Sequence, residues 1–163
     1  MPNLEVEETE SSEVEESCSP QRQQRSLMFH LLYAMEAHDY EVSLASIIDS
    51  FNRGFDTNIE LDGELARQTQ AIIDEREALE ATIKPLLANW RLERVGLCTR
   101  IILRMATWEL LNSTIGPKII LNEAIELAKC FSERDAYKFV NGILDELLKR
   151  LDAQRLKSPS SGE

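Results

Sequence analysis

Apolar residues recur at intervals of three and four along most of the chain, and this period constrains the fold more than any other feature. Leu27, Leu31 and Met35, for example, fall on one face of a helix. Glycine and proline, which interrupt helices, are sparse between residues 21 and 151. No alternation of apolar and polar residues is long enough to indicate a strand. The pattern therefore predicts an all-α, compact domain of six or seven helices.

The starts of these helices are marked by residues that cap free backbone N–H groups. Ser19 is a good cap and Pro20 fits the first helical position, so the first helix is expected to begin there. Ser132-Glu133-Arg134-Asp135 has the spacing of a capping box and predicts the start of the last helix. The other helices are expected to start near Asp39, Asp62, Glu93 and Ile120.

Two proline positions are expected to interrupt the helical pattern. Pro85 should kink or break the third helix, because proline lacks an N–H and its ring collides with the preceding turn. Gly116-Pro117 should separate the central helix, which ends near Asn112, from the next one. The folded domain is accordingly expected to cover residues 19–152.

The two ends of the chain differ from this domain in composition. Residues 1–18 hold seven glutamates and no lysine or arginine, which predicts a disordered acidic tail. Residues 153–163 end in Ser, Pro and Gly and are expected to form a flexible tail. The formal net charge is −11, but the 18 basic and 22 acidic residues outside the tail leave only −4. A charge this small does not exclude nucleic acid, because local patches decide that.

Several classes of protein are disfavoured by the same sequence. The three cysteines, Cys18, Cys98 and Cys130, form no CxxC pair, so we expect no disulfide framework, no zinc site and a reducing compartment. His30 and His38 are too far apart on a helix to share a metal. The apolar runs are too short for a membrane span, and the acidic N-terminus lacks a secretory signal. We expect a cytoplasmic protein without metal or cofactor.

The carboxylates do not form a catalytic arrangement. Pairs such as Asp74 and Glu75 have no nucleophile or base positioned beside them, and a solvated helix face explains them. The chain also lacks a glycine-rich phosphate loop. An enzyme is therefore disfavoured.

Arg22 and Arg25 are unusual because they lie in the first turns of the first helix. The helix dipole makes that end positive, so cations there are slightly unfavourable unless an anion is nearby. Free N–H groups at a helix start also bind anions. The two arginines thus suggest a phosphate partner. The alternative is that they balance the acidic tail or face water.

Lys138 and Phe139 open the last helix and allow two interpretations. Phe139, Ile143 and Leu147 share one stripe, which is typical of a buried core face. If Phe139 is instead exposed beside Lys138, its ring becomes a platform for a base next to a phosphate contact. Single-stranded RNA is recognised in this way.

Three stretches of the chain resemble the NusB family of bacterial transcription antitermination factors. The most specific is LNEAIELAKCFSERDAYKFVNGILDELL, which resembles the C-terminal signature of that family. RSLMFHLLYAMEA resembles its first helix, and RLERVGLCTRIILRMATWELLN its central helix. The likeness covers about residues 21 to 151 and implies a NusB-like fold of two small helical subdomains.

The resemblance also implies a function and particular residues. Members of the family bind boxA-type RNA together with the ribosomal protein NusE. They then join other Nus factors and RNA polymerase, and support transcription and maturation of ribosomal RNA. Some members form homodimers, so a homodimer is among the assemblies implied. By position, the implied RNA contacts are Arg22, Arg25, Asp135, Lys138 and Phe139. Tyr33 matches a tyrosine that faces the ribosomal protein.

This sequence departs from the family pattern at several positions. Gln21, Gln23 and Gln24 dilute the N-terminal arginine motif. Leu86 stands where some relatives have an aromatic RNA contact, and Thr99 where some have a glutamate that faces the protein partner. Two alternatives therefore stay open. One is a NusB-like protein–protein interaction module that has lost strong RNA binding. The other is a role beside a separate RNA methyltransferase, because NusB-like domains also occur fused to such enzymes.

Overall fold

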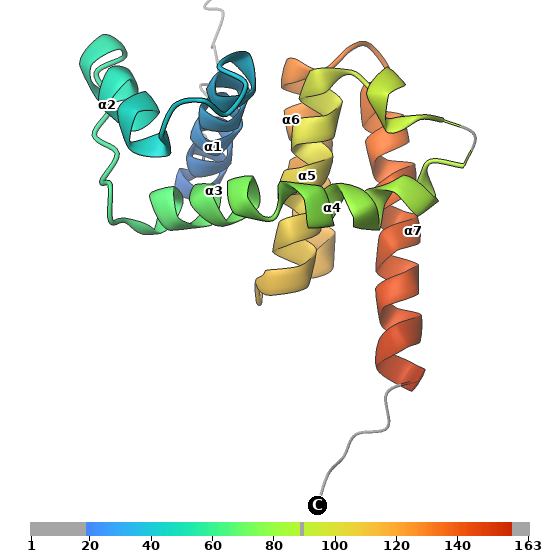
Figure 1. The fold of residues 1–163 in the computed structure, drawn as a ribbon. Coiled ribbons are helices and arrows are strands. Elements are labelled where there is room, and N and C mark those ends of the chain that lie inside the picture. Colours follow the sequence, from blue (N-terminus) through green and yellow to red (C-terminus); the bar gives the residue numbers. More distant parts are fainter. Residues whose placement is uncertain (1–18, 89, 158–163) are drawn as a thin grey trace, which may run out of the picture.

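The computed structural model describes residues 19–88 and 90–157, and these residues form seven α-helices and two short 3₁₀ helices without any strand (Figure 1). The all-α prediction is confirmed. The helices are α1 (Pro20–Ala37), α2 (Leu44–Gly54), α3 (Glu64–Asp74), α4 (Arg76–Ile83), α5 (Leu97–Asn112), α6 (Pro117–Phe131) and α7 (Ala136–Lys157), and the 3₁₀ helices are η1 (Lys84–Leu86) and η2 (Leu92–Arg94).

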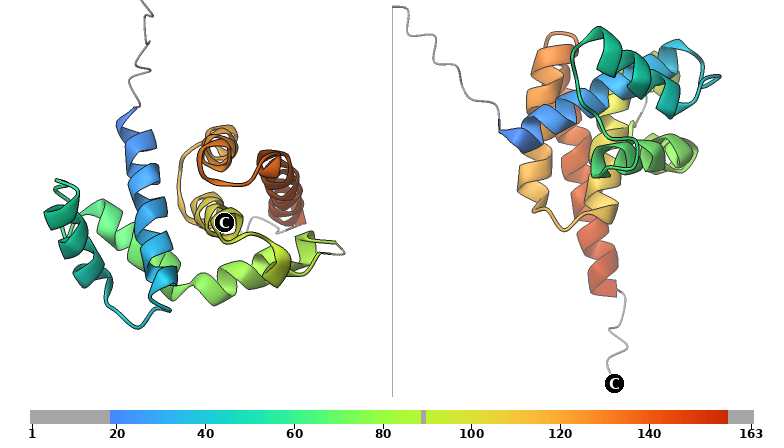
Figure 2. Two further views of the ribbon diagram at one scale, coloured as in Figure 1. Left: turned by 90° about the horizontal axis from the view of Figure 1, so that it is seen from above. Right: turned by 90° about the vertical axis from the view of Figure 1, so that its left-hand side faces the viewer.

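The helices form two small subdomains, as the resemblance implied. Helices α1, α2 and α3 lie on one side, and α4 to α7 lie on the other (Figures 1 and 2). Helices α3 and α4 follow one another in nearly one line and connect the two sides. Helix α5 is the shared centre, because it packs against α1, α3, α4, α6 and α7. All residues from Ile101 to Thr107 are buried there.

Local chemistry explains the helix starts that were predicted correctly. The Ser19 hydroxyl accepts a hydrogen bond from the backbone N–H of Arg22 at 3.2 Å, and Pro20 occupies the first turn. At Pro85 the α-helix gives way to η1, as expected of a residue without an N–H. Pro117 is likewise in the first turn of α6, after Gly116.

The expected start of the second helix was wrong. Helix α2 begins at Leu44, with Ser43 as its cap, and not near Asp39. Asp39 and Tyr40 have positive φ angles of 52° and 58°, so they form a turn that no helix can include. The turn lets the Tyr40 hydroxyl meet Arg104 of α5 at 2.9 Å.

The predicted capping box at the start of the last helix was also wrong. Ser132 is the C-terminal cap of α6, and its hydroxyl accepts a hydrogen bond from the Thr99 hydroxyl at 3.2 Å. Asp135 has a φ of 68°, which breaks the chain direction just before α7. Thr99, noted above as a departure from the family, is thereby part of a buried contact between α5 and the loop after α6.

Helix α7 extends further than expected. It runs to Lys157, and its last turns project beyond the other helices (Figure 1). Residues 153–157 therefore belong to the helix, because they include good helix formers and no glycine or proline until Pro159. The acidic segment 1–18 and residues 158–163 lie outside the described residues.

Candidate nucleic-acid interface

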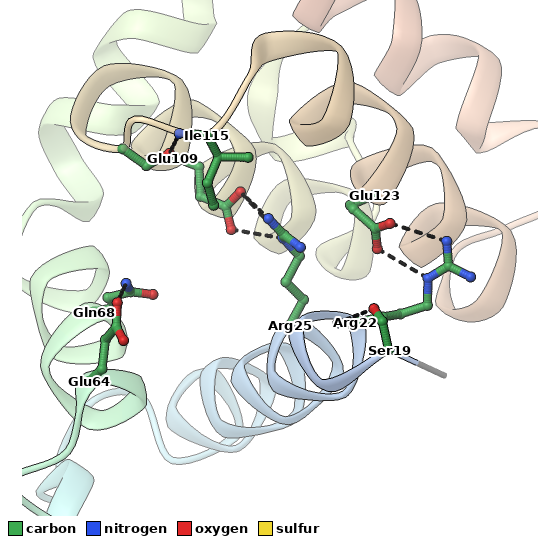
Figure 3. A network of polar contacts seen from close by, with 9 residues as sticks. Ser19, Arg22, Arg25, Glu64, Gln68, Glu109, Ile115 and Glu123 are labelled. Carbon is green, nitrogen blue, oxygen red and sulfur yellow. Dashed lines mark hydrogen bonds and ion pairs between the residues drawn. The ribbon is translucent and has the colours of Figure 1, made fainter. Parts of the chain in front are cut away.

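The two arginines at the start of α1 make ion pairs with other helices (Figure 3). The Arg22 guanidinium donates two hydrogen bonds of 3.1 Å to the carboxylate of Glu123 on α6. The Arg25 guanidinium donates to the carboxylate of Glu109 on α5 at 3.0 and 3.1 Å. Such paired geometry suits guanidinium and carboxylate groups particularly well. Both arginines thus attach α1 to the second subdomain.

Burial distinguishes the two pairs. The side chains of Arg25 and Glu109 are only 10% and 11% exposed, whereas that of Arg22 is 40% exposed. Arg25 therefore has a structural role that sequence reasoning missed, and contact with RNA would require its buried pair to open. Arg22 keeps a face toward solvent. RNA binding by either arginine stays a prediction.

Asp135 and Lys138 lie at the start of α7. Both side chains are about two-thirds exposed, and the Lys138 ammonium is 3.6 Å from the Asp135 carboxylate. The ring of Tyr137 lies near two cations, with the Lys129 and Lys138 nitrogens 5.1 and 5.9 Å from its centre. Lys129 belongs to the last turn of α6. Each ammonium is also 3.6 Å from a carboxylate, that of Glu126 for Lys129 and that of Asp135 for Lys138, so the lysines and Tyr137 form a surface of paired charges at this end of α6 and α7.

The burial of Phe139 agrees in part with each of the two interpretations drawn from the sequence. Its ring is half-buried and packs against the core, but it also lines an open cavity of about 250 Å³. The lining also includes Trp90, which is 62% exposed and belongs to the segment between η1 and η2. In the part of the chain that the structure describes, neither ring stacks on another aromatic side chain.

The rest of this cavity is lined by charged groups and by the start of α5. Arg94, Glu133, Arg134 and Asp135 contribute two positive and two negative charges. Within the described residues, the side chains of Arg94, Glu133 and Arg134 make no hydrogen bond or ion pair. Burial raises the pKa of the Cys98 thiol, and the negative charge of Glu133 raises it further. The Glu133 carboxylate thus faces the first turn of α5.

The structure divides the predicted site residues into two groups. Asp135, Lys138 and Phe139 lie together at the start of α7, beside the cavity. Arg22 and Arg25 lie on α1, and α6 separates α1 from α7 in both Figure 1 and Figure 2. No described residue of α1 lines the cavity. The two groups therefore form separate surfaces on either side of α6.

Tyr33, the predicted contact for a protein partner, is 45% exposed on α1. Its ring lies 6.3 Å from that of Phe29, which stacks on Phe131 of α6 at 4.5 Å. Residues of the first subdomain and of α6 thus hold the tyrosine at the surface. Its role toward a partner stays a prediction.

Sequence reasoning missed Trp90, Arg94, Glu133 and Arg134. A signal was present for the first two, because a tryptophan and two arginines follow a proline-broken helix in the string WRLER. Such a segment is a poor candidate for core, since its charges cannot be buried unpaired. Glu133 and Arg134 were read only as parts of a capping box. Their meeting with Trp90 depends on the fold and has no signal in the sequence.

The described residues contain no cluster of three or more His, Cys, Asp or Glu side chains that could hold a metal. Among the same residues, no helix is long and apolar enough to cross a membrane. Fold and site together define an all-α protein of two subdomains, with an aromatic and charged surface at the start of its last helix.

Comparison with known proteins identifies the family. The NusB family model matches residues 22–149. The transcription antitermination protein NusB of Staphylococcus haemolyticus is 40% identical over 127 residues, which are 77% of this chain and 97% of that protein. That of Staphylococcus aureus is 38% identical over 129 residues, which are 78% of this chain and 98% of that protein. The chain belongs to the NusB family, and its curated relatives carry the name of transcription antitermination proteins.

Solved structures agree with this assignment. Thermotoga maritima NusB superposes with a TM-score of 0.71 at 30% identity, covering 80% of this chain and 92% of that one. A chain in the crystal structure of a plectonemic RNA supercoil superposes with a TM-score of 0.69 at 22% identity. It covers 81% of this chain and 96% of that one, and at this identity it shows the fold alone.

Proposed function

We propose that this protein is a cytoplasmic transcription antitermination factor that binds single-stranded boxA-type RNA together with the ribosomal protein NusE. In this role it joins other Nus factors on RNA polymerase and supports ribosomal RNA transcription and maturation. The observation that carries the RNA part is the start of α7. There the half-buried ring of Phe139 lines an open cavity, next to the exposed ammonium of Lys138. The family and its relatives support the antitermination part.

The chemistry of this surface suits a single strand. An aromatic ring with an accessible face can stack on an unpaired base, and a neighbouring ammonium can contact the phosphate beside it. Lys129 is a second ammonium near the Tyr137 ring and could contact a further phosphate of the strand. Arg22 is the second proposed contact, on the other side of α6, where phosphate would compete with Glu123.

The test is fluorescence anisotropy of labelled boxA-type RNA, with NusE present and salt varied. Lys138→Ala should weaken binding and make the slope of log affinity against log salt less negative by about 0.7, the value for one lost contact on a single strand. Lys149→Ala is the matched control, because Lys149 is 69% exposed on α7 and also pairs with an aspartate, at 3.2 Å. Phe139→Leu keeps an apolar side chain but removes stacking, so it should weaken binding by about 1–3 kcal/mol.

The partner is tested separately. Tyr33→Ala should weaken NusE binding in calorimetry by at least about 1 kcal/mol, because exposed tyrosines are frequent anchors of interfaces. RNA affinities that are the same for Lys138→Ala, Phe139→Leu and Lys149→Ala would refute the proposed RNA surface.

A second candidate function is an interaction module that keeps the ribosomal partner but has lost strong RNA binding. The observation in its favour is that Arg22 and Arg25 are engaged by Glu123 and Glu109 within the molecule. A pull-down of NusE with and without RNA discriminates the two. Capture of the ribosomal protein with no detectable RNA affinity in any combination would favour this candidate.

A further inference from the structure

We propose that the cavity lined by Trp90 and Phe139 is a site for one nucleobase, and that it selects guanine. The proposal deepens the proposed function, since the base would belong to the bound strand. It goes further by naming an individual subsite, its chemistry and a residue, Glu133, that reads the base.

The walls of the cavity suit a flat, uncharged group. Trp90 is mostly exposed and Phe139 half-buried, and neither is occupied by another aromatic ring among the described residues. The volume of about 250 Å³ is below that of pockets for drug-sized ligands, so it fits one base and not a folded oligonucleotide. The four charges of the lining cancel, which favours a neutral base over a phosphate.

The polar groups of the lining point to guanine among the four bases. An ionised carboxylate can only accept hydrogen bonds, and it accepts two donors side by side. Guanine alone presents two adjacent donors, N1–H and N2–H, on its Watson–Crick edge. Arginine donates to the O6 and N7 acceptors of guanine, and the side chains of Arg94 and Arg134 make no hydrogen bond or ion pair in the described chain. The carboxylate of Glu133 thus matches the two donors of guanine, and the guanidinium groups of Arg94 and Arg134 match its acceptors.

Gly96 offers a way to fill the cavity without replacing any of the proposed recognition groups. A Cβ atom built there would lie 3.7 Å from the Glu133 carboxylate oxygen and would meet no other heavy atom within 4 Å, apart from its chain neighbours. The φ angle of Gly96 is −54°, which any residue adopts. Gly96→Leu should therefore fill the cavity while the helices stay in place.

The first experiment uses free guanosine monophosphate and the full chain. Trp108→Phe leaves Trp90 as the only tryptophan, so its fluorescence reports on stacking in the cavity. We expect saturable quenching by guanosine monophosphate, and about tenfold weaker binding of adenosine, cytidine and uridine monophosphates. Glu133→Gln should remove this preference, whereas Glu77→Gln, a control at an exposed position of α4 outside the cavity lining, should not. In the wild-type chain, which keeps both tryptophans, the NMR resonances of the two indole N–H groups can be recorded during the same titration.

The second experiment uses boxA-type RNA with NusE and replaces each guanine in turn by inosine, which lacks the N2 amino group. One replacement should weaken binding to the wild-type chain and have no further effect on Glu133→Gln or Gly96→Leu. The proposal is overturned if all four nucleotides quench equally, if none quenches saturably, or if Glu133→Gln matches its control. RNA binding that survives these results would leave the proposed function standing. Guanosine-selective quenching without any RNA binding would support the subsite and refute the proposed function.

Discussion

The buried pair of Arg25 and Glu109 makes a quantitative prediction about what the N-terminal arginines do. Each side chain is about a tenth exposed, and together they join α1 to α5 through hydrogen bonds of 3.0 and 3.1 Å. Arg25→Ala would leave the Glu109 carboxylate buried without its partner. Breaking a buried pair in this way costs about 3–5 kcal/mol. That is a large part of the roughly 5–15 kcal/mol that stabilises a typical domain.

Urea unfolding followed by helical circular dichroism measures this cost. In a separate thermal unfolding experiment, the melting temperature should fall by about 6–20 °C, at roughly 2–4 °C per kcal/mol for a chain of this size. Arg53→Ala is the control: Arg53 pairs with Asp49 on the same helix, α2, and the two side chains are 75% and 62% exposed. Its cost should be no more than about 1 kcal/mol. Equal unfolding free energies for the two variants would refute the reasoning.

A double variant separates stability from RNA contact. Arg25→Met with Glu109→Leu replaces the pair by apolar side chains of similar size, which is often neutral for stability. If Arg25 acts only by holding α1 on α5, the double variant should bind RNA like the wild-type chain. If it binds as weakly as Arg25→Ala after correction for the unfolded fraction, the guanidinium contacts RNA directly.

Two further predictions concern stability. Burial opposes ionisation of Glu36, but hydrogen bonds from Tyr40 and Arg104 outweigh it and lower the pKa of the carboxyl below its usual 4.5. A lowered folded-state pKa gives stability that is present above pH 4.5 and is lost as the pH falls through the folded value. In Glu36→Gln the unfolding free energy should therefore fall less steeply as the pH drops below 4.5. A dependence of unfolding free energy on pH equal to that of the wild type would contradict this. Asp135 has a positive φ of 68°, so Asp135→Ala should lower the unfolding free energy by about 1 kcal/mol. Asp135→Gly should leave it equal or higher, and two identical costs would exclude backbone strain as the cause.

The parts of the fold that could be predicted are those fixed by neighbouring residues. The apolar period indicated the helices, and Ser19 with Pro20 indicated the first of them, because both effects act within a few residues. Ser132 shows the limit. Its sequence context is that of a cap for the following helix, but it serves the preceding one and meets Thr99, 33 residues away. The turn at Tyr40 likewise depends on Arg104, 64 residues away.

The same limit applies to the candidate site. Lys138 and Phe139 could be singled out as candidates because they are adjacent and share the start of one helix, and their contact with RNA stays a prediction. Arg25 was assigned to a partner outside the molecule, because nothing local reveals Glu109, 84 residues later. The apolar period predicts the face of a helix on which a side chain lies, but it does not predict which side chain of another helix contacts it. Trp90 and Glu133 also come together only when α5 and α7 pack.

The structure also explains how two separate surfaces can serve one complex. Tyr33 lies beside Phe29 on α1, and Phe29 stacks on Phe131 at the end of α6. The residues directly after Phe131 form the loop that supplies three of the four charges of the cavity, Glu133, Arg134 and Asp135. One aromatic stack therefore lies between the predicted partner surface and the proposed base site. Because stacked rings in a packed core hold one geometry, the spacing of the two surfaces is set before either ligand binds. A protein partner seated on α1 would thus be held at a constant distance from a strand that crosses the start of α7.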